Sequence, residues 1–135
     1  MTKVAALVGR SGSGKSTAIM ALIVHFRGRG FTVGAIKHTH HPLNEEHRGD
    51  TGRFRDAGAD PVILARGDEA VIFSSTGTRR VRFSSAEDLL QHFPTDIVLV
   101  EGFKEEGDWP RILIDAENRR TPAELAARLE DAWRV

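Results

Sequence analysis

The residues best suited to chemistry lie near the start of the chain, in a glycine-rich segment. Gly9 to Ser16 read GRSGSGKS and match the pattern G-x-x-x-x-G-K-[ST]. Glycines let backbone N–H groups approach phosphate oxygens, and a following helix directs its partial positive charge at the same oxygens. In such a loop Lys15 reaches the terminal phosphates and the Ser16 hydroxyl binds Mg²⁺. We expect a nucleoside triphosphate held by Gly9, Arg10, Ser11, Gly12, Ser13, Gly14, Lys15, Ser16 and Thr17. The alternative is a glycine turn that only joins a strand to a helix.

A phosphate loop of this kind works with a carboxylate that holds the metal ion or orders its water. Asp96 begins and Glu101 ends one apolar strand, which places them roughly 16 Å apart. Ligands bind at the carboxyl ends of parallel strands, which favours Glu101 over Asp96. The alternative is that Glu101 only caps the strand end. Asp50 is a second candidate, or else the N-cap of a short helix. The expected metal ligands are Ser16, Asp50 and Glu101.

A histidine-rich segment supplies a second group of candidates. Four of the six histidines fall within ten residues, namely His38, His40, His41 and His47. The segment 37–41 directly follows an expected strand, so it should lie at the same end of the sheet as the phosphate loop. Imidazoles could form a metal site, or the segment could be a solvated polar loop. A third interpretation is an anion pocket for the phosphate of a nucleotide or a second ligand, formed by Lys37, His38, His40 and His41.

The hydrophobic pattern predicts the framework that positions these groups. Continuous apolar runs indicate buried strands at 4–8, 31–36, 97–100 and 112–114. Helical spacing predicts a helix over 19–26 that ends at Gly28 and Gly30, and the segment 37–49 reads as a loop. A short helix over 51–57 is expected to have Asp50 or Thr51 as its cap and Gly58 as its terminator.

The second half of the chain adds strands near 62–65, 70–74 and 79–83, whose short connections favour antiparallel pairing. A helix at 86–92 is expected to carry a capping box formed by Ser84 and Glu87. The last helix begins at Thr121, followed by a proline and by a glutamate at the third position. Its apolar stripe is Leu125, Leu129 and Trp133. The sum is one α/β domain over residues 1–135, with a mainly parallel sheet and an antiparallel extension.

Composition narrows the function classes. The chain has 19 basic and 19 acidic residues, so its formal net charge is zero, which argues against general affinity for nucleic acid or anionic membranes. It has no cysteine, which excludes disulfides, thiolate zinc sites and iron–sulfur clusters. The first apolar run has five residues, and no run approaches the roughly 20 that a membrane-spanning helix needs. We therefore expect a cytoplasmic location.

Four segments in this order resemble the MobB family of GTP-binding adaptor proteins in molybdopterin-guanine dinucleotide biosynthesis. They are the strand with Gly9-x4-Gly14-Lys15-Ser16, the segment Lys37-His38-Thr39-His40-His41, the segment Gly49-Asp50-Thr51 with Arg53 and Ala57-Gly58-Ala59, and Leu99-Val100-Glu101-Gly102-Phe103-Lys104. The K-H-T-H-H and V-E-G-F-K segments are the specific part. The resemblance covers about the first 115 residues and implies a three-layer, P-loop NTPase-like fold.

The resemblance also implies an activity. Such proteins bind GTP with Mg²⁺, hydrolyse it slowly, form homodimers and assist a MobA-type guanylyltransferase that acts on molybdopterin. Carried over to this chain, Gly12–Thr17 hold the triphosphate, and Lys15, Asp50 and Glu101 form the catalytic set. The resemblance also implies that the histidine segment and Lys104 face the site and contact the partner or molybdopterin. Thr51 replaces the usual serine, and the N-K-x-D segment that reads guanine is absent, the nearest asparagine being Asn118. Guanine preference therefore rests on resemblance alone.

Slow hydrolysis also follows from the residues. The only glutamine, Gln91, precedes the strand at 97–100, so no glutamine is placed to orient the attacking water. No arginine finger is evident, although Arg10 and Arg53 are close in sequence to the expected site.

One rival function is a small-molecule kinase with Arg48, Arg53 and Arg55 in a lid. The lack of an inserted lid domain argues against a kinase. Another is a pure binding module.

A dimer has a modest physical rationale. Apolar residues on the strands between 62 and 83 need covering, either by a second copy or within the chain; they are Val71, Ile72, Phe73, Val81 and Phe83.

Overall fold

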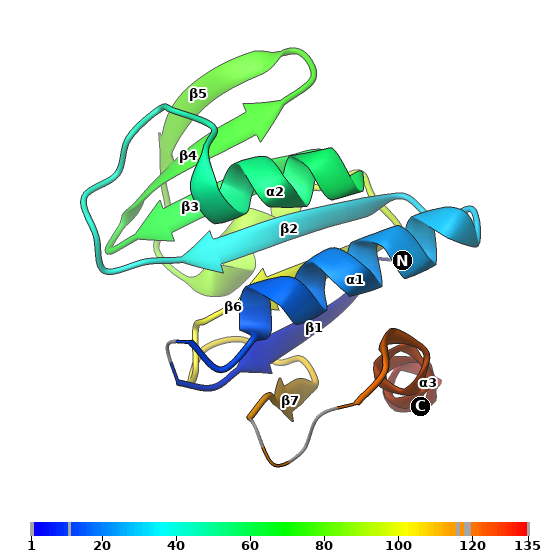
Figure 1. Ribbon diagram of the computed structural model, residues 1–135. Helices are drawn as coiled ribbons and strands as arrows, with labels where there is room; N and C mark the ends of the chain where they lie inside the picture. The colour runs from blue at the N-terminus through cyan, green and yellow to red at the C-terminus, as the bar shows by residue number, and fades with distance from the viewer. Residues whose placement is uncertain (1, 11, 116, 118–119, 135) are drawn as a thin grey trace.

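The structure is a computed structural model that describes residues 2–10, 12–115, 117 and 120–134. Ser11 and Asn118, named above, lie outside the described residues. Seven strands form one sheet in the order β5-β4-β3-β2-β6-β1-β7 (Figure 1). The strands are β1 (Lys3–Val8), β2 (Val33–His38), β3 (Val62–Arg66), β4 (Glu69–Ser74), β5 (Gly77–Arg82), β6 (Ile97–Glu101) and β7 (Arg111–Leu113). The helices are α1 (Lys15–Gly28), α2 (Gly49–Ala57), the 3₁₀ helix η1 (Ala86–His92) and α3 (Pro122–Trp133).

The sheet is parallel at its centre and antiparallel at one side, as the pattern predicts. β1 pairs in parallel with β6 and β7, and β2 pairs in parallel with β6 and β3. β3, β4 and β5 form an antiparallel meander. The carboxyl ends of the five parallel strands therefore meet at one edge of the sheet, where ligands of such sheets bind.

Both faces of the sheet are covered. On one face α1, α2 and α3 pack against alternate residues of the strands, with Phe26, Phe54 and Leu129 fully buried (Figure 1). The other face is covered by η1 and the segment after β6, with Leu89, Phe93 and Trp109 in its core. Because both faces are buried, the central strands carry continuous apolar runs rather than alternation.

Several local predictions are confirmed. The Thr121 hydroxyl accepts the backbone N–H of Glu124 at 3.1 Å and the Glu124 side chain returns the bond, so the capping box starts α3 as expected. Gly58 ends α2 with φ +118, a conformation that favours glycine. Leu125 and Leu129 are buried, and Trp133 packs against the same core while its Nε1 donates to the Val4 carbonyl at 2.9 Å.

Other local predictions are wrong in detail. The 86–92 helix is 3₁₀, and its capping box uses Ser85 and Asp88 rather than Ser84 and Glu87. The second strand is shifted by two residues and ends at His38, so the loop begins at Thr39. Neither Asp50 nor Thr51 caps α2; Arg48 is the N-cap and makes no side-chain cap bond. The Asp50 carboxylate instead contacts Ser16 and Lys37 outside its own helix, and Arg53 within it.

The apolar side chains that suggested a dimer are mostly covered within the chain. Val71 is completely buried, and Ile72 and Phe73 are 3% exposed. Val81 and Phe83 are partly buried against the core beneath η1. The fold therefore covers most of the apolar surface of the β3–β5 region within the chain.

No helix in the described part of the chain is long and apolar enough to cross a bilayer.

Candidate active site

The phosphate loop joins the end of β1 to the start of α1. Gly14 is the N-cap of α1 with φ +97, and a helix with no capping side chain leaves its first N–H groups directed at the loop. No acid lies in the first turn of α1. Position 9 requires glycine because the backbone after β7 passes close to it, and a Cβ there would lie 2.4 Å from the Ile114 carbonyl oxygen. This geometry leaves the loop able to accept an anion.

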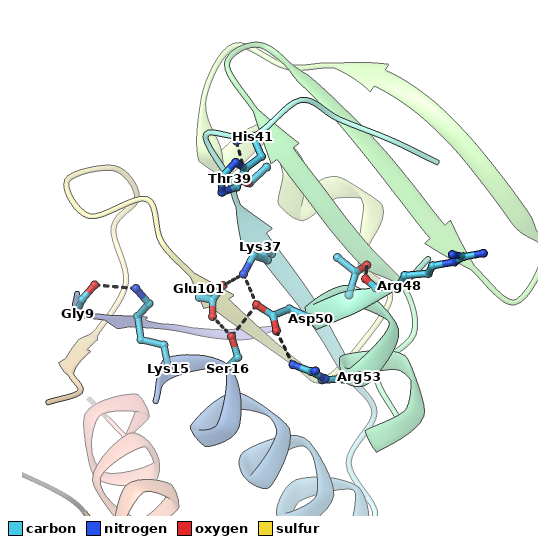
Figure 2. A network of polar contacts seen from close by, with 11 residues as sticks. Gly9, Lys15, Ser16, Lys37, Thr39, His41, Arg48, Asp50, Arg53 and Glu101 are labelled. Carbon is cyan, nitrogen blue, oxygen red and sulfur yellow. Dashed lines mark hydrogen bonds and ion pairs between the residues drawn. The ribbon is translucent and has the colours of Figure 1, made fainter. Parts of the chain in front are cut away.

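Two further polar groups in the loop point to a phosphate ligand. The Lys15 Nζ donates to the Gly9 carbonyl at 2.7 Å, which keeps the ammonium over the loop (Figure 2). The Ser13 Oγ is buried and has no hydrogen-bond partner among the described residues. A buried hydroxyl without a partner is unfavourable, so a bound phosphate or ribose oxygen would satisfy it.

The two predicted carboxylates meet at the first turn of α1. The Ser16 Oγ lies 2.8 Å from Asp50 Oδ2 and 2.5 Å from Glu101 Oε1 (Figure 2). Asp50 reaches this point from α2, and Glu101 from the last position of β6. Two carboxylates and a hydroxyl are hard oxygen donors of the kind that Mg²⁺ prefers. The structure therefore brings together the three residues predicted as metal ligands.

Lys37 lies between the two acids. The strand register places it directly opposite Glu101 on the neighbouring strand, and its Nζ forms ion pairs with Asp50 Oδ2 and, at 2.7 Å, with Glu101 Oε2 (Figure 2). Arg53 is more distant, with its NH1 3.4 Å from Asp50 Oδ1. The Glu101 side chain is only 5% exposed, so this ion pair compensates a buried charge.

Electrostatics keep both partners charged. Burial lowers the pKa of Lys37, but its hydrogen bonds to Asp50 and Glu101 and their charges outweigh burial, so the pKa lies above its ordinary value. Burial raises the pKa of Asp50, but the hydrogen bonds from Lys37 and Ser16 and the charges of Lys37 and Arg53 outweigh it, so the pKa lies below its ordinary value. At neutral pH Asp50 is therefore a carboxylate and an acceptor.

A cleft of about 580 Å³ connects the phosphate loop to the histidine segment. It is lined by Gly12, Gly14, Lys15, Ser16, Thr17, Lys37, His38, Thr39, His40, His41, Asp50, Arg53, Glu101 and Gly102. The prediction that the segment 37–41 lies at the ligand end of the sheet is confirmed. A larger hollow of about 690 Å³ shares His40 with this cleft. The cleft also includes the N-terminus of α1, which has no acid in its first turn, so the cleft is the better anion site.

The histidines differ in their surroundings. His38 stacks on Phe103 at 4.2 Å between ring centroids and meets the edge of His40. Burial, and next the charge of His40, lower the pKa of His38 against the opposing charge of Glu106, so its ring is neutral at pH 7. His47 lies away from the cleft, stacked on Phe73. Within the described ranges no three His, Asp or Glu side chains are placed to hold a metal ion, so the histidine segment offers no protein-only metal site.

The remaining candidates lie outside the cleft. Asp96 sits at the opposite end of β6, where it accepts from the Thr32 N–H at 2.9 Å, as the strand geometry predicts. Arg10 lines a separate cavity beside Asp115 and Glu117. Lys104 is exposed and does not line the cleft, and Gln91 lies on η1.

Two residues that the sequence analysis quoted in the family segments, but gave no role in the site, support it in the structure. Thr39 is buried at the foot of the histidine segment, where its Oγ1 accepts the His41 N–H at 3.1 Å. Phe103 is buried with φ +52, an unusual backbone conformation for a bulky residue, and supports His38 from below. The signals for Phe103 in the sequence were the preceding glycine and its place in the V-E-G-F-K segment.

The family model described as "Molybdopterin guanine dinucleotide synthesis protein B" matches residues 4–132. A molybdopterin-guanine dinucleotide biosynthesis adapter protein of Haemophilus influenzae is 38% identical over 120 residues, which cover 86% of this chain and 65% of that protein. The adapter protein of Escherichia coli is 32% identical over 78% of this chain and 62% of that protein. The chain thus spans less than two thirds of the length of these relatives.

A solved structure supports the fold. The crystal structure of Bacillus subtilis MobB has a TM-score of 0.50 and 23% identity, covering 93% of this chain and 72% of that one. At this identity the likeness concerns the arrangement of strands and helices only. It agrees with a mixed α/β fold with a mostly parallel sheet.

Proposed function

Because this chain belongs to the molybdopterin guanine dinucleotide synthesis protein B family, we propose that it is a GTP-binding adapter. On this proposal it binds GTP with Mg²⁺, hydrolyses it slowly and assists a MobA-type guanylyltransferase in adding a guanylyl group to molybdopterin. The observation that carries the nucleotide part is the meeting of Ser16, Asp50 and Glu101 beside the phosphate loop.

The loop and the acids divide the work of binding. Backbone N–H groups of residues 12–17 and the Lys15 ammonium bind the phosphates, while Ser16, Asp50 and Glu101 hold the metal ion directly or through its water. When bound, Mg²⁺ neutralises charge on the β- and γ-phosphate oxygens. Asp50 and Glu101 are hydrogen-bonded acceptors, so their role is to position and stabilise rather than to move protons.

The nucleoside has room on the other side of the loop. The metal-binding groups lie toward β2 and β6, so the sugar and base extend toward β7 and α3. Two cavities of about 300 and 490 Å³ lie there and share Ser13 and Ile114 in their walls. Leu125 lines the smaller cavity and Asp115 the larger. The choice of guanine follows from the family, since the chain has no N-K-x-D segment.

Hydrolysis is expected to be slow. The side chains that line the cleft include no glutamine to orient the attacking water, and Arg53 faces Asp50. A missing arginine finger typically costs about 10³–10⁵ in rate. The chain by itself should therefore behave as a switch or scaffold, and many turnovers per second without a partner would contradict this.

The rival kinase has less support. A kinase needs cations that close over the transferred phosphate, yet of the three arginines considered only Arg53 lines the cleft. Arg48 pairs with Glu46 on the surface, and Arg55 lines a different cavity. Phosphoryl transfer to a small acceptor, in place of release of free phosphate, would favour the kinase.

Calorimetry tests the nucleotide part. We expect GTP to bind with Mg²⁺ more tightly than ATP or GDP, and Lys15→Met to abolish that binding while the circular dichroism spectrum stays the same. No binding of GTP by the wild-type chain would refute the proposal.

The adapter role needs a second test, with a purified molybdopterin guanylyltransferase. We expect the chain to raise formation of the guanine dinucleotide when GTP is present. If Asp50→Asn and Glu101→Gln abolish hydrolysis but leave partner affinity and stimulation intact, the chain is a pure binding module. Direct contact with molybdopterin, through the histidine segment or Lys104, would appear as pterin fluorescence quenching.

The homodimer is also a prediction from the family. Because most of the apolar side chains of β3–β5 are covered within the chain, this region does not require a second copy. Light scattering decides the matter: a mass near 14.9 kDa at every concentration would refute the dimer.

A further inference from the structure

The ammonium of Lys37 contacts the same carboxylates that the proposed function assigns to the metal ion. It is paired with Asp50 Oδ2 and with Glu101 Oε2, while the Ser16 hydroxyl lies against Asp50 Oδ2 and Glu101 Oε1 (Figure 2). We propose that Lys37 occupies the metal position in the nucleotide-free protein, so that a divalent cation enters only together with the triphosphate, and that the displaced ammonium then binds the terminal phosphate. This inference rests on the proposed function.

The carboxylate oxygens are already engaged. Lys37 and Ser16 take three of the four, and the fourth, Asp50 Oδ1, faces Arg53 at 3.4 Å. The charges of Lys37 and Arg53 balance those of Asp50 and Glu101, so the cluster is formally neutral. A divalent cation that entered alone would gain no net attraction from a neutral cluster. It would also be repelled by the Lys37 ammonium, because two positive charges a few ångströms apart repel each other strongly. The nucleotide-free protein should therefore bind the cation weakly.

A triphosphate changes this balance. It brings several negative charges into the cleft lined by Lys37 and the phosphate loop, and its oxygens provide a new partner for the ammonium. Lys37 has a flexible four-carbon stem, and its anchor on β2 is held opposite Glu101 by the strand register. The ammonium can thus leave the carboxylates without movement of the backbone.

The other lysine of the cleft provides a matched comparison. Lys15 donates to the Gly9 carbonyl and forms no ion pair with Asp50 or Glu101 among those the structure records. Replacing Lys15 removes one positive charge from the same cleft without uncovering the carboxylates. A general effect of charge and a specific competition for the metal position are therefore distinguishable.

The first test is metal binding without nucleotide. Mn²⁺ is titrated into the nucleotide-free protein, and free Mn²⁺ is followed by electron paramagnetic resonance. We expect Lys37→Met to raise Mn²⁺ affinity by about tenfold or more over wild type, and Lys15→Met to change it by less than about threefold. Lys37→Gln, which keeps a hydrogen-bond donor but no charge, serves if Lys37→Met fails to fold. Equal Mn²⁺ affinity in wild type and both Lys37 variants would overturn the proposal.

The second test concerns the terminal phosphate. Affinities for GTP and GDP are measured with Mg²⁺ for wild type and Lys37→Met. If the ammonium moves to the terminal phosphate, the variant loses about tenfold in GTP affinity and less than about threefold in GDP affinity. If the ratio of GTP affinity to GDP affinity is the same in both proteins, Lys37 does not bind the terminal phosphate, and that part of the proposal is overturned. Failure of wild type to bind GTP would instead refute the proposed function, and the Mn²⁺ result would still stand.

Discussion

Replacement of Gly102 by alanine tests whether the end of β6 is built around the end of β2. Gly102 follows Glu101 directly and has φ +98, a conformation that side chains rarely adopt. A Cβ added there would lie 2.8 Å from the Cβ of His38. That atom is fixed by the backbone of β2, so the contact cannot be relieved by rotation of a side chain. The substitution should push the two strand ends apart.

The cost has two parts, and a second glycine separates them. A non-glycine residue in the left-handed region costs about 1–2 kcal/mol, and overpacking adds about 1–3 kcal/mol. Gly30, two residues after the end of α1, has a similar φ of +91 with nothing within 4 Å of an added Cβ. Gly30→Ala therefore carries the first cost alone, and Gly102→Ala carries both, about 2–5 kcal/mol in total.

Urea unfolding measures both variants. With a denaturant dependence of about 2 kcal/mol per molar, the midpoint should fall by about 0.5–1 M for Gly30→Ala and by about 1–2.5 M for Gly102→Ala. Where folded protein remains, Gly102→Ala should also weaken GTP binding, because it displaces Glu101, whereas Gly30→Ala should not. Equal midpoints for the two variants would show that β2 and β6 do not meet as described.

Three further predictions address the acids, a partly buried histidine and a helix cap. Asp96→Asn should leave Mg²⁺-dependent GTP affinity within about twofold in calorimetry, while Glu101→Gln lowers it roughly tenfold, because only Glu101 lies at the ligand end of β6; equal effects would contradict the site. Burial, and next the charge of Arg55, lower the pKa of His47 below its ordinary 6.5. As the pH falls, the unfolded chain therefore takes up a proton at this histidine before the folded protein does. The contribution of neutral His47 to the free energy of unfolding is full above pH 6.5 and is lost as the pH falls below it. His47→Phe keeps a ring on Phe73 and should flatten the fall in urea midpoint between about pH 7.5 and about pH 5.5; an unchanged slope counts against this. Thr121→Ala should cost about 1 kcal/mol in urea unfolding through loss of the α3 cap, with GTP affinity unaffected.

The phosphate loop and the strand ends illustrate what local pattern can predict. The glycine spacing of residues 9–16 requires a turn that only glycine tolerates, and the apolar runs of β1 and β6 require burial on both faces. From these alone the loop, its lysine and the position of Glu101 at the ligand end follow. The cap of α3 at Thr121 follows in the same way, since a capping box involves residues three apart.

Other features escaped local reasoning because neighbours distant in sequence decide them. The helix at 86–92 is a 3₁₀ helix that buries Ala86 and Leu89 against the sheet. Phe103 adopts a positive φ with its ring stacked on His38, a contact across 65 residues of chain that no periodicity records. The apolar residues of β4 were compatible with a dimer interface in the sequence, but the fold buries them within the chain.

The sequence by itself determined that a loop with the phosphate-loop pattern lies between a buried strand and a helix, because the glycines, the lysine and the hydroxyl are close together along the chain. Only the tertiary structure decided that β6 lies between β1 and β2 and so sets Lys37 opposite Glu101. It also brought Asp50, 34 residues away, to the hydroxyl of Ser16. Strand order and register depend on burial summed over the whole sheet, and no short segment carries that information.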